Sequence, residues 1–109
     1  MYHFFFDNYS QYKETRIQKR RFDESLWQEL IKEWTKSPYL QVTKIGETFE
    51  KRAIHEVKFG QGPIQIIAWS QMHGDEATAT MALCDIFNFI NSNRSEERRV
   101  GKECLRLCR

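Results

Sequence analysis

The sequence has few of the residues that mark several classes of protein. Its 109 residues include only 2 Pro and 5 Gly while 14% are aromatic, which excludes collagen-like and disordered chains. No apolar run is long enough for a membrane-spanning helix. Phe4, Phe5 and Phe6 form too short a cluster for a signal peptide and have no small-residue cleavage site after them. We therefore expect one small, soluble domain in the cytoplasm, without a membrane partner.

The last sixteen residues differ in composition from the rest of the chain. R-S-E-E-R-R-V-G-K-E-C, residues 94–104, resembles the translation of a common sequencing-library adapter. We therefore interpret residues 94–109 as a non-native read-through tail. Six of the 17 basic and three of the 15 acidic side chains lie in it, so residues 1–93 carry 11 basic and 12 acidic side chains, a net charge of −1. A nucleic-acid partner is not expected, and the basic run Lys19, Arg20 and Arg21 is predicted to be a solvated face.

Only one of the 3 cysteines precedes the tail. A single thiol, Cys84, cannot form an internal disulfide, which fits a reducing compartment. Because Cys84 lies among apolar residues, we expect it to be part of the core. Cys104 and Cys108 lack a second pair of ligands, so they do not predict a metal site.

Residues 1–93 alternate between helical and extended patterns. Phe5, Tyr9 and Tyr12 have the spacing of a short amphipathic helix. A second helix is capped by Asp23 or Ser25 and stopped by Ser37 and Pro38. Its apolar residues fall on one face: Leu26, Trp27, Leu30, Ile31 and Trp34.

Three strands and a third helix follow. Residues 40–46 and 54–59 predict an antiparallel hairpin, in which His55, Val57 and Phe59 share a face. Residues 64–70 are almost continuously apolar, which is typical of a strand buried on both faces. Residues 79–90 have helical spacing and are predicted to pack on that strand. The order indicates the start of an α/β sheet. His55 is a weak metal candidate, because a lone His in a strand is normally a packed residue.

The polar turn between the apolar strand and the last helix carries the candidate chemistry. His73 and Glu76 are three residues apart, with His73 in the loop and Glu76 expected in the first helical turn. Imidazole and carboxylate are both zinc ligands, and this spacing lets them converge on one cation. Gly74 between them is expected to leave the approach open and to allow an unusual backbone conformation. The alternative is an exposed His73 beside a Glu76 that interacts with the helix dipole.

S-Q-M-H-G-D-E-A-T-A-T-M-A-L, residues 70–83, resembles the zinc metallocarboxypeptidases of the carboxypeptidase A type, together with the hairpin and strand before it. The bacterial members without a signal or pro-segment are the most similar. The resemblance implies an incomplete α/β fold, the N-terminal part of a mixed-sheet zinc carboxypeptidase domain, in residues 1–93. The family usually has a Gly-Arg pair before its second strand; Arg52 matches it and Lys51 does not.

The resemblance also implies the activity of the parent protein, which is hydrolysis of the C-terminal peptide bond of a peptide substrate. His73 and Glu76 stand at two of the three protein ligands of one Zn²⁺. Zinc polarises the scissile carbonyl and lowers the pKa of its bound water, and a downstream Glu takes the proton. The third His ligand, that Glu and the groups that hold the substrate carboxylate have no counterpart here, so this chain is expected to be inactive.

Two alternatives stay open. Zinc deacylases of N-acyl amino acids, of the succinylglutamate desuccinylase and aspartoacylase type, have a similar His-Gly-x-Glu turn. Asp75, where Asn would be expected in a deacylase, and the preceding S-Q-M favour the peptidase. The non-enzymatic alternative is a basic binding module, which rests on the tail and on Lys19, Arg20 and Arg21. It would bind nucleic acid with a steep dependence on salt.

Overall fold

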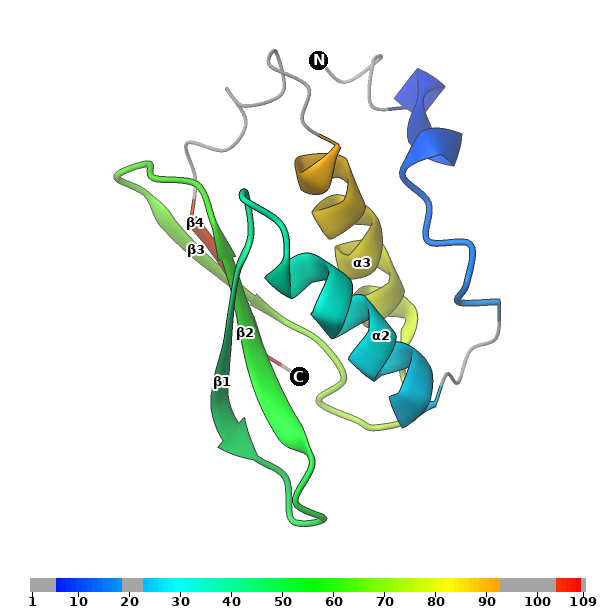
Figure 1. Ribbon diagram of the computed structural model, residues 1–109, viewed down its shortest axis with the longest axis vertical. Helices are drawn as coiled ribbons and strands as arrows, with labels where there is room; N and C mark the ends of the chain where they lie inside the picture. Colours follow the sequence, from blue (N-terminus) through cyan, green and yellow to red (C-terminus); the bar gives the residue numbers. More distant parts are fainter. Residues whose placement is uncertain (1–5, 19–22, 93–103, 109) are drawn as a thin grey trace.

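The computed structural model of the chain describes residues 6–18, 23–92 and 104–108, with the side chains of the last range left out. Two helices lie on one face of a four-stranded sheet (Figure 1). The elements are the 3-10 turn η1 (Tyr9–Gln11), α2 (Glu24–Thr35), β1 (Gln41–Glu47), β2 (Ala53–Phe59), β3 (Gln65–Trp69), α3 (Thr78–Asn91) and β4 (Cys104–Cys108). The fold is therefore mixed α/β, as the sequence predicts. Neither described helix is both long and apolar enough to span a membrane.

Helix α2 forms in the segment for which the cap and the spacing of apolar residues predict a helix. The Asp23 side chain accepts a hydrogen bond of 2.9 Å from the backbone N–H of Leu26, which satisfies one of the free donors at the helix start. Of the two predicted caps, Asp23 is confirmed. Within the first two turns, the Gln28 side chain donates to the Glu24 carboxylate at 2.7 Å. The predicted face is buried at Trp27, Leu30, Ile31 and Trp34.

The hairpin is confirmed. Strands β1 and β2 pair antiparallel, with Val42 opposite Val57 and a bulge between Lys44 and Gly46. Its connection closes through Thr48 N–H to Arg52 carbonyl (2.8 Å) and Lys51 N–H to Thr48 carbonyl (2.9 Å). Lys51 has φ 65°, a left-handed conformation that glycine adopts without strain. A glycine would therefore suit this position better than Lys51 does.

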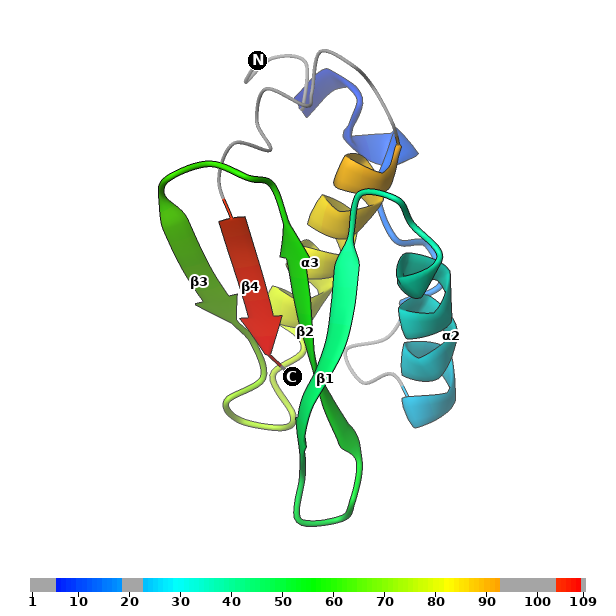
Figure 2. The same ribbon diagram turned by 60° about the vertical axis from the view of Figure 1, so that its left-hand side comes forward.

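The sheet has the order β1-β2-β4-β3. Strand β4 pairs antiparallel with β2 and parallel with β3, so the carboxyl-terminal strand lies between two strands that precede it in the chain (Figure 2). Residues 104–108 belong to the stretch that we interpret as a read-through tail. Their pairing in the sheet does not test that interpretation, which stays a prediction. The other tail residues, 94–103 and 109, lie outside the described residues.

In this chain residues 64–70 are not buried on both faces, although their apolar pattern is typical of such a strand. Ile64, Ile67, Trp69 and, less so, Ile66 are exposed, and Trp69 has 58% of its surface accessible. Among the described elements both helices cover the same face of the sheet, and β3 is an edge strand (Figures 1 and 2). The apolar pattern is that of an interior strand, but the described part of the chain covers only one of its faces.

The core lies between the helices and the covered face of the sheet. Helix α3 begins and ends within one residue of its predicted bounds, and Cys84 is buried in it, as expected. Trp34 packs edge-to-face on Trp27 and on Phe87, with ring centroids 5.9 and 5.0 Å apart. The buried core consists of Ile17, Trp27, Leu30, Ile31, Trp34, Leu40, Val57, Phe59, Leu83, Cys84 and Phe87.

The N-terminal segment crosses the outer side of the helices (Figure 1). Where the sequence predicts a helix from Phe5, Tyr9 and Tyr12, the described residues Phe6 and Asp7 are helical and η1 follows, after which the chain continues to residue 18 without helix or strand. Tyr12 is buried edge-to-face against Phe89, with centroids 4.9 Å apart. Phe5 and the basic run Lys19, Arg20 and Arg21 lie outside the described residues.

Candidate metal site

The turn that carries His73 and Glu76 connects the carboxyl end of β3 to α3. In open α/β sheets, ligands bind in the crevice beyond the carboxyl ends of the strands. The turn is tightened by a backbone hydrogen bond of 3.1 Å from the N–H of Glu76 to the carbonyl of His73. It therefore projects two chemically suitable side chains from the end of the sheet where ligands collect.

The structure brings the two predicted ligands together. His73 Nδ1 lies 3.1 Å from Glu76 Oε2, and both side chains are exposed, at 72% and 70% of their surface. The two atoms form a hydrogen bond with each other, and a cation that replaced it could reach both of them from solvent.

The position of Glu76 differs from the prediction. Helix α3 begins at Thr78 with Ala77 as its N-cap, so Glu76 precedes the helix and does not belong to its first turn. The hydrogen bond between Glu76 and His73 closes a four-residue turn and delays the start of the helix. His73 and Glu76 therefore belong to one hydrogen-bonded turn, and the expected place of Glu76 in the first helical turn is wrong.

The expected role of Gly74 is also wrong. Its backbone is not in the left-handed region, and a Cβ built on it meets nothing within 4 Å. The left-handed conformation occurs instead at Gln71, with φ 54°. The change of chain direction after β3 is therefore made by a residue with a side chain, at the start of the turn.

A buried polar network fixes the base of the turn, and the sequence reasoning missed it. Thr80 is completely buried, and its Oγ1 lies 2.7 Å from Ser70 Oγ and 2.9 Å from Gln71 Oε1. The other end of the Gln71 amide donates to the Gly74 carbonyl at 2.9 Å. The available signal is Thr80 itself, a polar residue in the first turn of an otherwise largely apolar helix.

The donor set of the turn suits zinc. Two ligand atoms, each about 2.0–2.1 Å from a tetrahedral zinc, lie about 3.3 Å apart, close to the 3.1 Å between His73 Nδ1 and Glu76 Oε2. Within the described ranges, no group of three His, Cys, Asp or Glu side chains could hold a metal. The turn thus offers a pair of donors and solvent for the remaining positions.

His55 does not join this pair in the described structure. It lies in β2, where burial lowers its pKa, and its Nδ1 is buried without a hydrogen-bond partner. A neutral, half-buried imidazole is what its position on the packed face predicts. The interpretation of His55 as a packed strand residue fits this environment.

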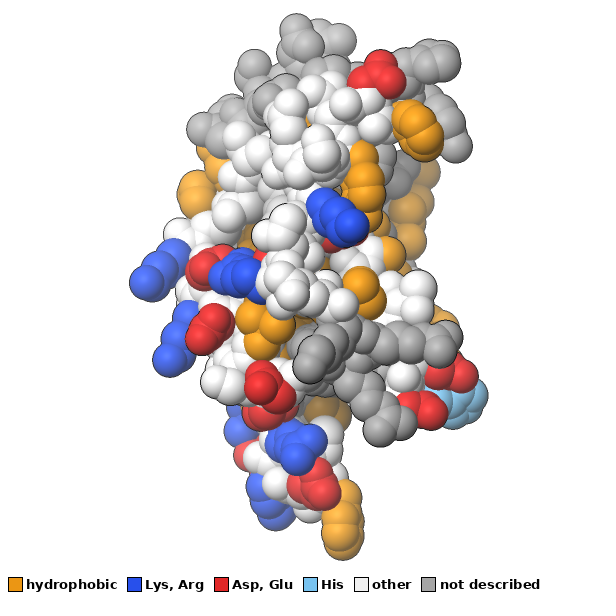
Figure 3. Space-filling view, turned by 90° about the vertical axis from the view of Figure 1, so that its right-hand side faces the viewer, with side chains coloured by type: hydrophobic (Ala, Val, Ile, Leu, Met, Phe, Trp, Pro, Cys, Tyr) orange, Lys and Arg blue, Asp and Glu red, His pale blue; other side chains and the backbone are white. Residues whose placement is uncertain are grey.

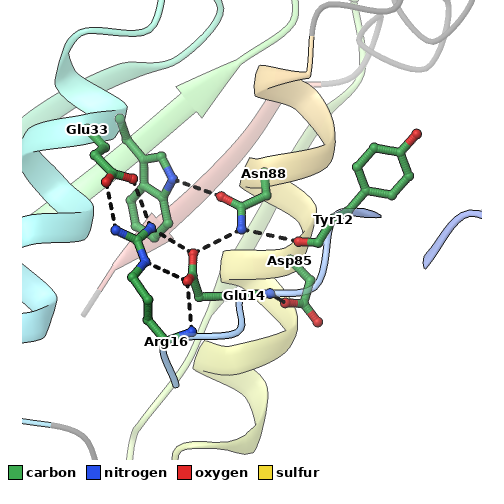
Figure 4. Close-up of polar contacts among 7 residues, drawn as sticks. Tyr12, Glu14, Arg16, Glu33, Asp85 and Asn88 are labelled. Atoms are coloured by element: carbon green, nitrogen blue, oxygen red, sulfur yellow. Dashed lines mark hydrogen bonds and ion pairs between the residues drawn. The ribbon is translucent and has the colours of Figure 1, made fainter. Parts of the chain in front are cut away.

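A second polar cluster ties the N-terminal segment to the helices (Figure 4). The buried Glu14 carboxylate accepts hydrogen bonds from Arg16 Nε at 2.7 Å and from Asn88 Nδ2 at 3.0 Å. The Arg16 guanidinium, with a smaller contribution from Asn88, holds the pKa of Glu14 below its usual value against the opposing effect of burial. Arg16 also donates to Glu33 on α2, at 2.6 and 2.8 Å. This cluster is saturated with partners and acts as a clamp.

Asp85 on α3 provides a second anchor for the same segment. Its carboxylate accepts a hydrogen bond of 2.7 Å from the backbone N–H of Glu14 and one of 2.6 Å from the Tyr9 hydroxyl. That hydrogen bond raises the pKa of Tyr9, because it stabilises the protonated phenol.

Comparison of the chain with protein-family models, with curated proteins and with solved structures found no match.

Proposed function

We propose that the chain is the N-terminal part of a zinc-dependent metallocarboxypeptidase domain, in which His73 and Glu76 are two of the three protein ligands of the metal. The observation that carries the proposal is the 3.1 Å approach of His73 Nδ1 to Glu76 Oε2 on a solvent-exposed turn beyond β3. The parent protein would hydrolyse C-terminal peptide bonds in the cytoplasm. The chain itself has neither a third ligand nor a base at this turn and would be inactive.

The residues of the turn have separate roles in this proposal. His73 would bind the cation through a neutral ring nitrogen, and Glu76 would contribute an anionic oxygen that partly balances the charge of the metal. Zinc bound here would supply Lewis acidity and a water of lowered pKa. Both ligands lie on one hydrogen-bonded turn, so they would lose little conformational freedom on binding the metal.

The basic-module alternative rests on Lys19, Arg20, Arg21 and the tail, whose side chains lie outside the described part of the chain. On the face shown in Figure 3, Lys and Arg side chains are interspersed with Asp and Glu side chains. Ion pairs within the described part of the chain join Lys44 to Glu47 at 2.6 Å and Arg52 to Glu50 at 3.1 Å. A nucleic-acid surface needs a continuous positive stripe, and the described side chains on this face do not form one.

Zinc titration by calorimetry tests the proposal. The titration uses the 109-residue chain with the substitutions Cys104→Ser and Cys108→Ser, so that thiols after residue 93 do not bind the metal. We expect weak binding of one ion, because two protein ligands leave the site open. His73→Ala and Glu76→Ala should each lower the affinity at least roughly tenfold.

Gly74→Ala is the matched control, since it changes the same turn without removing a donor, and it should bind zinc as the starting chain does. Tight binding of one ion that survives both ligand substitutions would mean that the site is elsewhere and would refute the proposal.

A further inference from the structure

The residue that holds the turn in place lies outside the His-x-x-Glu motif. We propose that Gln71 is a positioning residue: its carboxamide ties the turn to helix α3 and thereby sets the separation of His73 and Glu76. The role of Gln71 in metal binding rests on the proposed metal site. Its role in ordering the turn rests on hydrogen bonds that need no metal.

The hydrogen bonds around Gln71 form a chain with one direction. Thr80 has a single hydroxyl proton, and it donates this proton to Gln71 Oε1. The 2.7 Å bond between Ser70 and Thr80 must then be donated by Ser70. At the other end, Gln71 Nε2 donates to the Gly74 carbonyl, an acceptor only. The amide thus has one orientation, because a flip would place two acceptors against each other.

The backbone conformation of Gln71 does not by itself explain why a glutamine stands at this position. At φ 54°, a residue with a Cβ is strained, and glycine would suit the backbone better. The two hydrogen bonds of the carboxamide offset this strain. A shorter side chain would not span the same two partners, which lie on α3 and in the turn.

The hydrogen bond from Gln71 to the Gly74 carbonyl affects the positions of the two candidate ligands. Gly74 lies between His73 and Glu76, so fixing its carbonyl orients the peptide units on either side of it. The anchor at the far end is Thr80, which is fully buried and therefore held by the core. Loss of the Gln71 amide should loosen the turn and separate the two donors while leaving both of them in the chain.

Two substitutions at one position separate the amide from the backbone. Gln71→Met keeps a long unbranched side chain and removes both hydrogen bonds. Gln71→Gly removes them too but relieves the left-handed strain. Gln61→Met, at an exposed loop position, is the matched control. Fluorescence of the buried Trp27 and Trp34 reports whether each variant is folded.

The first readout is amide hydrogen exchange at Glu76, measured by NMR without metal. We expect the Glu76 amide to exchange about tenfold faster in Gln71→Met and in Gln71→Gly, and unchanged in Gln61→Met. Retained protection in a folded Gln71→Gly variant would overturn the inference, because the backbone conformation alone would then order the turn. If Gln71→Met does not fold, Gln71→Gly decides the question by itself.

The second readout is zinc affinity, measured by calorimetry on the same variants. The affinity should fall at least threefold in both Gln71 variants, since disordered ligands pay ordering entropy on binding. Unchanged affinity would overturn the claim that Gln71 positions the donors. If the unsubstituted chain binds no zinc, the proposed function fails, and the exchange rates still decide whether Gln71 orders the turn.

Discussion

Glu14→Gln tests the clamp that holds the N-terminal segment on the helices. In the native structure, Glu14 Oε1 accepts from the backbone N–H and Nε of Arg16, at 3.2 and 2.7 Å. Its Oε2 accepts from Arg16 Nη2 and Asn88 Nδ2, each at 3.0 Å. A glutamine of the same shape has one oxygen, so in either orientation its NH₂ group faces two donors.

The size of the change in the free energy of unfolding depends on how far the lost hydrogen-bond partners are buried. A hydrogen bond to a charged group contributes about 1.5–3 kcal/mol. Arg16 is 36% exposed and keeps its bonds to Glu33, so water compensates part of its loss. We therefore expect the free energy of unfolding to fall by about 2 kcal/mol. With a urea m-value of about 2 kcal/mol/M, the midpoint should fall by about 1 M.

Urea unfolding of the 109-residue chain, followed by Trp fluorescence, measures the change. Glu33→Gln is the matched control, because it alters the exposed partner of the same guanidinium and should change stability by less than about 0.5 kcal/mol.

The pH dependence supplies a second test of the clamp. The pKa of Glu14 is lowered in the fold, so its contribution is complete above its ordinary pKa and is lost as the pH falls through the folded value. The difference between the two proteins should shrink from pH 7 to about pH 3. A difference below 0.5 kcal/mol at pH 7, or one that is the same at both pH values, would refute the reasoning.

Three further predictions follow from the fold. Lys51→Gly should raise the free energy of unfolding by about 0.5 kcal/mol in a urea titration, because the relief of left-handed strain exceeds the added chain entropy; a loss of stability would contradict this. Burial lowers the pKa of His55, so its neutral form stabilises the fold above its ordinary pKa and this contribution is lost as the pH falls below it. Stability should decline from about pH 7.5 to 5.5 and decline less in His55→Gln; equal declines would contradict the assignment. Residues 1–93 alone lack β4, which leaves β2 and β3 with unpaired edges, and should associate and melt without a sharp transition; a cooperative melt from a monomer in size-exclusion chromatography would show otherwise.

Local patterns in the sequence were enough to predict the elements that depend on local physics. The apolar spacing of Trp27, Leu30 and Trp34, with Asp23 as a cap, predicts α2, because cap and period are both read within one segment. The same holds for the β1–β2 hairpin and for α3. These patterns could not show the environment of β3, since the burial of Ile67 and Trp69 depends on what the rest of the chain places on each face.

The polar contacts that shape the site and the clamp join residues far apart in the chain. Asp85 reaches Glu14 across 71 positions, and Asn88 reaches it across 74. No periodicity predicts such pairs, because each residue alone is an ordinary polar residue. The pairing of His73 with Glu76 was predictable because only three residues separate them. The role of Gln71 was not, since it depends on a φ angle that a sequence does not display.

An independent determination of the coding sequence beyond Asn93 tests the proposal that residues 1–93 begin a zinc carboxypeptidase domain. We expect the reading frame to replace the R-S-E-E-R-R-V-G-K-E-C codons with a longer sequence that carries a third His ligand and, further on, a Glu that serves as general base. Recovery of the same codons from unamplified genomic DNA, followed by no such residues, would contradict it.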